Sequence, residues 1–236
     1  MRYMRYPLPP GLGASAKVTE TVIRAMVPRP DVSLVTTFYF GEVKNERTFL
    51  FPPILRREVL EAEPEEGDAI LVYFTKAFDS FLDMLAASQG ERFIVYGMGS
   101  RPDRGRIQFR APSRDGFLND LARSKAVIAT AGFTLMTECL HLGKPLFALP
   151  MTGQFEQELN AHLLEDAGYG RSGRGNPEEQ EAALHDFFEH VPHFSAALAS
   201  YPRADNSAIT AKLDELLADG GARAETYRQA RRETSR

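Results

Sequence analysis

The residues with the clearest chemical use lie between positions 126 and 170. A short apolar run leads into Gly132, and a helix is predicted to begin directly after this glycine. The exposed N–H groups of a helix N-terminus bind phosphate, so this turn could hold a nucleotide diphosphate. Glu138 lies four residues after Thr134 and shares its helical face. A carboxylate there suits the two vicinal hydroxyls of a ribose. Alternatively, Glu138 pairs with a neighbouring basic side chain.

The helix that carries Glu138 is predicted to be short. Gly143 ends it, Pro145 prevents its continuation, and a second strand follows at residues 145–150. That strand leads into a loop with amide side chains, among them Gln154 and Gln157, before another helix begins. The segment therefore reads as strand, glycine turn, helix, strand and polar loop.

Strands and helices alternate through the middle of the chain. The other predicted elements, in chain order, cover residues 14–26, 32–40, 69–74, 79–88, 92–96, 107–110 and 116–124. The alternation is typical of an α/β fold with a doubly wound parallel sheet of the Rossmann type. We expect three regions: a lead segment over residues 1–64, a sheet domain over residues 65–175, and C-terminal helices over residues 176–236.

The composition is that of an ordinary globular protein. The chain has 236 residues, 43% of them hydrophobic, which is enough to bury one sizeable core. A net charge of −4 argues against a dedicated nucleic-acid binder. No apolar stretch approaches the roughly 18 to 20 residues of a membrane span, and no signal-peptide pattern is present. With Cys139 as the single cysteine, we expect a cytoplasmic protein with a buried structural thiol.

The histidines show no metal-ligand spacing. His141 and His162 flank the amide loop, and the other three, at positions 185, 190 and 193, are predicted to cluster around the start of a C-terminal loop. No acidic pair of the D-x-D type lies next to the glycine turn, and hydrolase, kinase and zinc-protease motifs are missing. We therefore expect no metal and no other cofactor.

These motifs resemble the C-terminal domain of GT-B glycosyltransferases. The resemblance covers most of the chain, and within that fold it is similar to the family-28-like group. That group contains the lipid-linked N-acetylglucosaminyltransferase of peptidoglycan synthesis and uncharacterised prokaryotic relatives. The residues that carry the resemblance are Ala131-Gly132-Phe133, Glu138, Gly143-Lys144-Pro145, Gly153-Gln154-Phe155-Glu156-Gln157 and Asn160-Ala161.

The resemblance implies a role for each matching residue. The backbone at Gly132, Phe133 and Thr134 would meet the donor diphosphate, and Glu138 would bind the ribose. The residues implied in contacts with the donor sugar are Gln154, Gln157 and Asn160. The family's usual Asp-Arg-Gln-Gln run is replaced here by Gln154-Phe155-Glu156-Gln157, so the sugar is not identified.

Two other strand ends are candidates for nucleotide contacts. Thr75 follows the first predicted strand of the sheet, where ligands bind in open α/β folds, although a solvated loop is the alternative. Arg110 ends the strand at 107–110, at the position where related transferases bind the nucleotide base. Gly97 and Gly99 lack the full glycine pattern of a dinucleotide site and predict a turn.

A GT-B enzyme has two Rossmann-like domains, and this chain has room for the donor-binding one alone. Residues 1–64 resemble the remnant of an N-terminal domain and the interdomain linker, which includes Pro52-Pro53-Ile54-Leu55-Arg56. The resemblance implies transfer of a sugar from a nucleotide diphosphate sugar, with UDP as the expected nucleotide, to an acceptor hydroxyl. No residue is a convincing general base, so the catalytic residue is unassigned.

Two other functions fit the same residues. A non-catalytic subunit could bind a nucleotide sugar and present it to a partner, which predicts an exposed apolar face. A nucleotide-sugar 2-epimerase shares the donor site but should need two complete domains.

The expected partners are a nucleotide-sugar donor and a glycan or lipid-linked acceptor of a cell-envelope polysaccharide. The acceptor domain is either an N-terminal portion that this sequence does not include or part of a partner polypeptide. A lipid-linked acceptor would bring the protein to the inner face of the membrane, where the charged run at 223–236 could contact anionic lipid.

Overall fold

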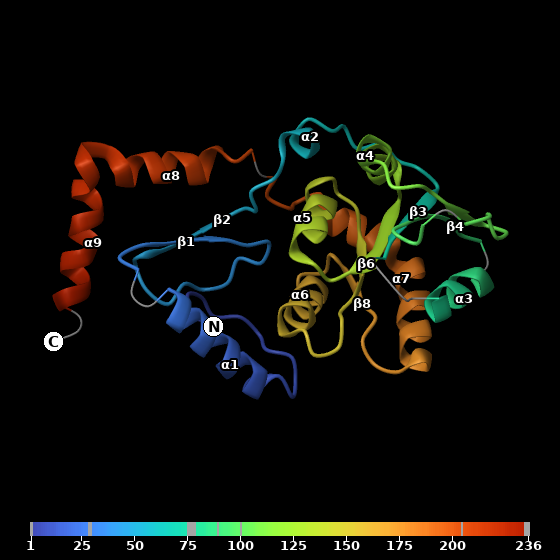
Figure 1. The fold of residues 1–236 in the computed structure, drawn as a ribbon, viewed down its shortest axis with the longest axis horizontal. Coiled ribbons are helices and arrows are strands. Elements are labelled where there is room, and N and C mark those ends of the chain that lie inside the picture. Colours follow the sequence, from blue (N-terminus) through green and yellow to red (C-terminus); the bar gives the residue numbers. More distant parts are fainter. Residues whose placement is uncertain are drawn as a thin grey trace. The chain divides into compact units, whose positions relative to one another are not determined.

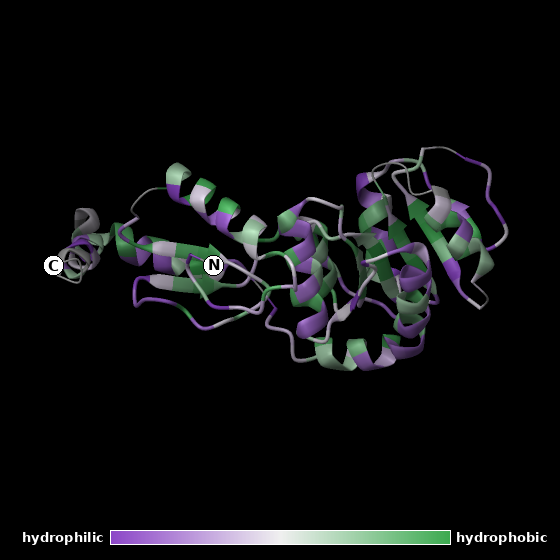
Figure 2. Cartoon of the chain, turned by 90° about the horizontal axis from the view of Figure 1, so that it is seen from below, coloured by the Kyte–Doolittle hydropathy of each residue, from purple (hydrophilic) through white to green (hydrophobic). Residues whose placement is uncertain are grey.

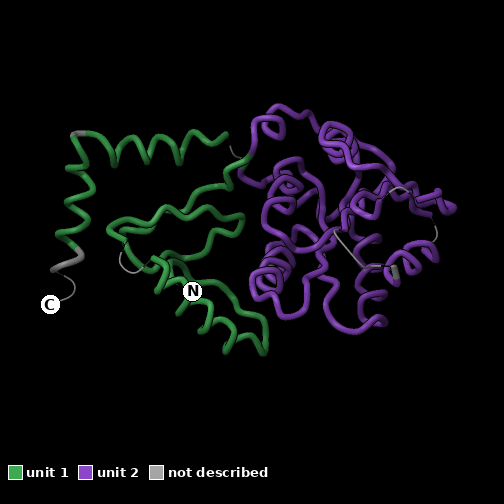
Figure 3. The backbone as a smooth tube through the Cα atoms, in the orientation of Figure 1, with its two compact units in different colours: residues 1–55, 203–236 green, residues 56–202 purple. Residues whose placement is uncertain are grey.

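The computed structural model describes residues 2–27, 30–74, 79–88, 90–99, 101–203 and 205–233. The chain divides into two compact units (Figure 3). Unit 1 combines residues 1–55 with residues 203–236, and unit 2 consists of residues 56–202. The three regions predicted along the sequence, with boundaries after residues 64 and 175, stay a prediction.

Unit 2 is built on a parallel sheet of six strands in the order β5-β4-β3-β6-β7-β8 (Figure 1). Its strands are β3 (Ala69–Tyr73), β4 (Arg92–Tyr96), β5 (Ile107–Phe109), β6 (Ala126–Thr130), β7 (Leu146–Leu149) and β8 (Gly170–Ser172). All four residues of β7 are buried, and so are the first four of β3 and of β6. Such continuous apolar runs are typical of parallel strands that are covered on both faces. The predicted α/β fold with a doubly wound parallel sheet is confirmed.

Helices cover both faces of this sheet. The hydrophobic core on one face joins α3 (Asp79–Ala87) and α7 (Pro177–Leu198) to the strands, with Phe147 among its fully buried side chains. On the other face lie α4 (Arg114–Arg123), α5 (Phe133–His141) and α6 (Phe155–Asp166) (Figure 1). The short α2 (Arg57–Leu60) precedes β3. Figure 2 shows the strands of this sheet as strongly hydrophobic and the helices as mixed, as expected for helices with one face on a core.

The prediction that three histidines surround the start of a C-terminal loop is wrong. His185, His190 and His193 all lie within the 22-residue helix α7. Asn176 and Glu179 form a capping box at its start, which satisfies exposed backbone N–H groups. Buried residues then recur at helical spacing and hold the segment on the sheet, so the helix continues through its internal proline. These residues are Leu184, Phe187, Val191, Phe194 and Leu198.

Unit 1 joins the two ends of the chain. It contains α1 (Gly13–Met26), β1 (Ser33–Thr36), β2 (Thr48–Phe51), α8 (Ser207–Leu217), the 3-10 helix η1 (Ala218–Gly221) and α9 (Ala222–Glu233). The side chain of Asn206 bonds both the N–H and the C=O of Leu55, at 3.0 and 2.8 Å. The ring of Phe49 packs against that of Tyr227, and the Lys212 ammonium lies 4.1 Å from the Phe49 ring centre. These contacts hold the C-terminal helices on β2.

The strands of unit 1 form a parallel pair, with Ser33 opposite Thr48. The predicted β-rich stretch at 32–40 is shorter in the structure, because β1 ends at Thr36. Directly after it, the hydroxyl of Thr37 accepts a hydrogen bond from the Tyr39 N–H at 3.1 Å. This local turn competes with continued strand pairing.

Candidate functional site

The predicted donor site lies where the strand order of the sheet reverses. Chain order runs outward from β3 through β4 to β5 on one side, and from β6 through β7 to β8 on the other. The carboxyl ends of β3 and β6 therefore flank the switch point, which is where ligands bind in open α/β sheets. The turn from β6 into α5 begins at this edge. The sheet topology supports the site independently of any sequence motif.

Gly132 lies between β6 and α5 with open space above it. A side-chain carbon added to Gly132 would meet no atom within 4 Å, although its φ of −74° suits any residue. The glycine therefore leaves room for close approach to the backbone and is not required by the turn itself. The N-cap residue of α5 is Gly132, which has no side chain to cap the helix, and Thr134 in the first turn is exposed. This helix N-terminus has the features of an anion site.

Glu138 lies one turn beyond Thr134, and its carboxylate is paired with Arg56. The Arg56 Nε donates to Oε1 at 2.8 Å, and a terminal guanidinium nitrogen donates to Oε2 at 3.2 Å. The Glu138 side chain is 7% exposed and that of Arg56 is 30% exposed. This hydrogen-bonded pairing raises the pKa of Arg56. The structure therefore shows the second of the two alternatives, in which Glu138 pairs with a basic side chain. Ribose binding by Glu138 stays a prediction.

Arg56 is the residue that the sequence analysis missed at this site. It was noted as part of the linker-like segment, but its partner lies 82 residues further along the chain. The signal in the sequence was an arginine next to an apolar linker and a glutamate inside an apolar helix. Such a glutamate needs a cationic or hydrogen-bonding partner when it is buried.

The far end of α5 follows the sequence prediction. Gly143 has a φ of +69°, in the left-handed region that favours glycine, and ends the helix. The next residue, Lys144, is buried, and its ammonium donates to the backbone carbonyl of Glu65 at 2.7 Å. Cys139 is fully buried, and burial strongly raises the pKa of its thiol. The predicted buried thiol is confirmed, and it is held in its unreactive form.

The loop after β7 brings Gln154 and Gln157 together. The Gln157 amide nitrogen donates to the Gln154 carbonyl oxygen at 2.8 Å, and the Gln157 oxygen accepts from the Met151 N–H at 3.1 Å. Gln154 is exposed and Gln157 is half-buried. Because β7 pairs with β6 through Leu149 opposite Thr130, this loop and the glycine turn lie at the same sheet edge. Each amide keeps donor capacity that could serve a sugar hydroxyl.

Asn160 holds the glycine turn from α6. Its amide nitrogen donates to the carbonyl of Ala131 at 3.1 Å, and the residue is buried. The residue that precedes Gly132 is thereby tied to the helix that follows the amide loop. In this structure Asn160 positions the turn, and its contact with a donor sugar stays a prediction.

The two remaining candidate residues lie further from this edge or outside the described part. Thr75 falls outside the described residues. Arg110 is exposed directly after β5, and one of its terminal nitrogens donates to the Gln108 side chain at 3.3 Å. The strands β4 and β3 separate β5 from β6, which puts Arg110 about 14 Å across the sheet from the glycine turn. A role in base binding stays a prediction.

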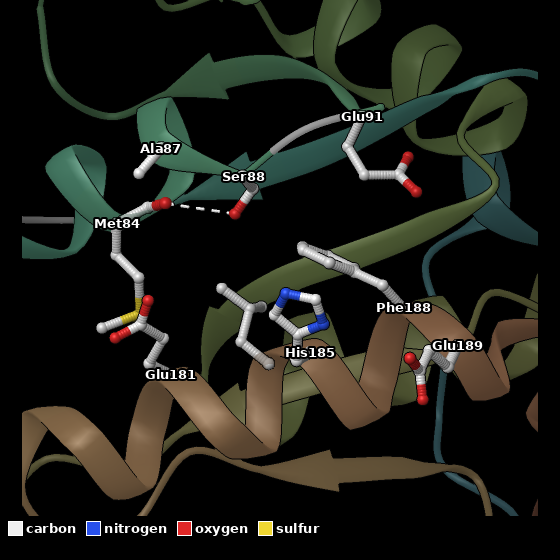
Figure 4. Close-up of a pocket in the computed structure, with 9 residues that line it drawn as sticks. Met84, Ala87, Ser88, Glu91, Glu181, His185, Phe188 and Glu189 are labelled. Carbon is white, nitrogen blue, oxygen red and sulfur yellow. Dashed lines mark hydrogen bonds between the residues drawn. The ribbon is translucent and has the colours of Figure 1, made fainter.

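A separate pocket of about 530 Å³ lies between α3 and α7 (Figure 4). It is on the sheet face opposite α5 and contains none of the predicted donor residues. Apolar side chains, carboxylates and an imidazole line it together (Figure 4). The lining residues are Met84, Ala87, Ser88, Glu91, Glu181, Leu184, His185, Phe188 and Glu189. The pocket is therefore separate from the candidate donor site.

Within the described residues, no three His, Cys, Asp or Glu side chains are grouped as ligands of a metal ion. None of the described helices combines the length and hydrophobicity of a membrane span.

Comparison with known proteins places this chain in a family. A family model described as "Glycosyl transferase family 1" matches residues 1–192. The chain belongs to this family. An uncharacterized glycosyltransferase of Methanosarcina mazei is 29% identical over 168 residues, which are 64% of this chain and 44% of that protein. Another from the same organism is 48% identical over 48 residues, which are 20% of this chain and 13% of that protein.

Solved glycosyltransferase structures share the fold. The glycotransferase of kitacinnamycin has a TM-score of 0.55 at 15% identity, over 84% of this chain and 60% of that one. Arabidopsis thaliana UGT89C1, solved with UDP-L-rhamnose, has a TM-score of 0.55 at 15% identity, over 80% of this chain and 55% of that one. The expected GT-B glycosyltransferase likeness is confirmed. The chain spans less than half of its curated relatives and about 55 to 60% of these solved chains.

Proposed function

We propose that this chain binds the nucleotide-sugar donor of a glycosyltransferase reaction. The observation that carries the proposal is the N-terminus of α5, which follows its glycine N-cap at the switch point of the sheet. Gly132 offers close backbone approach there, and the Gln154 and Gln157 amides lie along the same edge. A diphosphate at the helix end with its sugar toward the amide loop accounts for both features.

The reaction in this proposal is sugar transfer to an acceptor hydroxyl. The acceptor oxygen forms a bond to the anomeric carbon, and the bond from that carbon to the diphosphate oxygen breaks. The electron pair of the broken bond stays on the diphosphate, and the hydroxyl proton passes to a base on the acceptor side. The N–H groups and positive dipole end of α5 stabilise the charge that develops on the leaving diphosphate. The proposal includes no metal or other cofactor.

Glu138 can bind the ribose without releasing Arg56. Its two oxygens accept one hydrogen bond each from the guanidinium, and each carboxylate oxygen has a second lone pair. We therefore propose that the ribose hydroxyls join an existing pair. Arg56 orients the carboxylate through its two hydrogen bonds, which makes it a positioning residue for the ribose contact.

The finer assignment follows the resemblance to the relatives of the peptidoglycan N-acetylglucosaminyltransferase. We propose UDP as the nucleotide, Arg110 near the base, and Gln154, Gln157 and Asn160 near the sugar. The acceptor is a glycan or a lipid-linked glycan, and its binding site is supplied by an N-terminal domain that this sequence does not include or by a second polypeptide. In support of this, UGT89C1 was solved with UDP-L-rhamnose. A GT-B enzyme needs two domains, so we expect this chain alone to bind donor without turning it over.

Calorimetric titration of the purified chain with UDP, GDP, ADP and dTDP tests the proposal. We expect selective binding of one nucleotide and at least tenfold weaker binding by Glu138→Ala, since a hydrogen bond to a charged group contributes about 1.5 kcal/mol or more. Glu189→Ala is the matched control, because Glu189 lies in the separate pocket between α3 and α7. Absence of binding by all four nucleotides, or equal affinities of the two variants, would contradict the proposed site.

A further inference from the structure

The pocket between α3 and α7 has an apolar wall that the core of unit 2 holds in place. Leu184 is buried in this wall and Phe188 is half-buried. The Phe188 ring lies 6.2 Å from that of Phe93 and 6.1 Å from that of Phe187, between centroids. Figure 4 shows Phe188 extending from α7 toward α3 and the Met84 side chain extending from α3 toward α7. Packing on the core fixes the ring, so the wall is largely preformed.

Two carboxylates line the same pocket without a cationic partner. Glu181, His185 and Glu189 follow one another at four-residue spacing and share one side of α7. Glu181 and Glu189 are exposed, and neither forms an ion pair with another described residue. The third glutamate of the pocket, Glu91, differs, because its carboxylate lies 2.5 Å from the Lys125 ammonium. The pocket therefore keeps two negative charges that no described side chain neutralises.

The helices on both sides of the pocket are acidic. The helix α3 contains two aspartates, α7 contains five Asp and Glu residues, and neither helix contains a lysine or an arginine. The whole chain, by contrast, has 28 Lys and Arg residues against 32 Asp and Glu residues. Negative charge is thus concentrated around this cavity. Such a concentration attracts cations and repels anions, which sets this pocket apart from a phosphate site.

We propose that the pocket binds a small organic cation, a protonated amine carried on an apolar body. The ammonium donates N–H groups to the Glu181 carboxylate, and Glu189 adds negative charge further along α7. The apolar body packs against Leu184 and Phe188. Phe188 lies two turns after Glu181, about 10 Å along the helix, so the ligand joins its charge and its apolar end by a short chain.

The size and composition of the pocket suit this class of ligand. A cavity of about 530 Å³ lies in the usual size range of small-molecule sites, which combine apolar walls with a few polar groups. A metal ion is the less suitable occupant, because the described residues include no group of three His, Cys, Asp or Glu ligands. The site is separate from the donor site, and its ligand goes beyond the function proposed above.

Methyl NMR of the full chain tests the proposal, with the shift of the Met84 methyl group as the readout. The probes are 4-phenylbutylammonium, the neutral 4-phenylbutan-1-ol and the ammonium ion. We expect 4-phenylbutylammonium to bind at least about fivefold more tightly than either of the others, since it alone joins a cation to an apolar body. Equal binding of the alcohol and the amine would overturn the proposal, and so would a Met84 signal that no probe shifts.

A pair of charge variants tests the role of Glu181. Glu181→Gln should weaken binding of 4-phenylbutylammonium about fivefold, because the ammonium loses its carboxylate partner. Glu156→Gln is the matched control, since Glu156 is also exposed but lies on α6, on the opposite face of the sheet. If the two variants bind the amine with equal affinity, only the overall charge of the chain attracts it, and the assignment to this pocket is wrong.

A second pair of variants tests whether the ligand occupies the cavity. Ala87 is exposed and lines the pocket, whereas the neighbouring Ala86 is exposed and is not among the lining residues. Ala87→Trp should fill the cavity and weaken binding of 4-phenylbutylammonium at least about tenfold, and Ala86→Trp should leave it unchanged. Both positions are exposed, so we expect the two variants to keep the melting temperature of the wild-type chain. Full binding by Ala87→Trp would show that the amine binds elsewhere.

Discussion

The sheet of unit 2 and the sheet of unit 1 are both parallel, yet they bury their strands to different degrees. In unit 2, β3, β6 and β7 each bury four successive residues, and helices cover both faces. In unit 1, all four residues of β1 are half-buried, and its second edge has no described strand beside it. The same kind of strand pairing thus produces a closed core in one unit and an open layer in the other.

This difference separates the packed core of unit 2 from the exposed apolar surface of unit 1. Unit 2 has the buried aromatic core and the polar groups of the candidate donor site. Unit 1 has ten of the eleven exposed large hydrophobic residues of the described chain. Four substitutions test the comparison, and they are ordered by the size of the expected effect.

Phe147→Ala should have the largest effect, because it opens a cavity in the core of unit 2. Phe147 is fully buried and lies 6.1 Å from the ring of Phe81 and 5.6 Å from that of Phe187, between centroids. We expect the free energy of unfolding to fall by about 3–5 kcal/mol in urea titrations. Phe40→Ala, at an exposed position in unit 1, is the control and should cost under about 1 kcal/mol. Equal costs would contradict the contrast between the units.

Arg56→Ala should destabilise unit 2 by leaving Glu138 without its cationic partner. The carboxylate is nearly buried, whereas the guanidinium is about one third exposed, so we expect a loss of about 1–3 kcal/mol in the free energy of unfolding. The neighbouring Arg57 forms an exposed ion pair with Glu61, and Arg57→Ala should leave stability unchanged. If the two variants unfold at the same urea concentration, the Arg56–Glu138 pair does not stabilise the site.

Tyr201→Phe should change the alkaline stability of unit 2. Burial raises the pKa of the Tyr201 phenol, and its hydroxyl has no hydrogen-bond partner in the described structure. Above about pH 10 the unfolded chain releases this proton while the native state keeps it, so the free energy of unfolding falls as pH rises.

The slope from Tyr201 is about 1.4 kcal/mol per pH unit, and the variant should lack it. Burial also raises the pKa of the Tyr6 phenol in unit 1, to about 12. Tyr6→Phe is therefore the comparison in unit 1 for Tyr201→Phe in unit 2. Urea titrations at about pH 8 and about pH 11 measure both variants. A pH dependence of Tyr201→Phe that matches the wild-type chain would show that Tyr201 is not buried.

Val22→Lys should have the smallest effect on the isolated chain. The side chain is 51% exposed on α1, so we expect a change within about 0.5 kcal/mol in the free energy of unfolding. A large loss of stability, measured by the same urea titration, would mean that this side of α1 is part of the core of unit 1. The contrast between a closed and an open unit would then be wrong.

Several features of the site could be predicted because neighbouring residues determine them. The buried run of β6, the glycine turn, and the end of α5 at Gly143 follow from short-range preferences. The same is true of the shared face of Thr134 and Glu138, which helical geometry requires. The doubly wound sheet followed from the alternation of strands and helices along the chain.

Other features depended on contacts between distant residues. Arg56 reaches Glu138 across 82 positions, and Asn160 reaches the Ala131 carbonyl across 29. The prediction for the three histidines failed because packing of the apolar face of α7 on the sheet keeps that helix continuous through Pro192.

By itself, the sequence determined the periodicity, turns and burial pattern that make an α/β sheet with a helix N-terminus at its edge. These depend on residues close together in the chain. The tertiary structure decided that Arg56 pairs with Glu138 and that Asn160 holds the carbonyl of Ala131. It also decided that residues 203–236 join residues 1–55, through the contact of Asn206 with Leu55. Each of these pairings joins residues that are far apart in the chain. The distance along the chain does not say which polar groups are buried together, so the pairings depend on the whole fold.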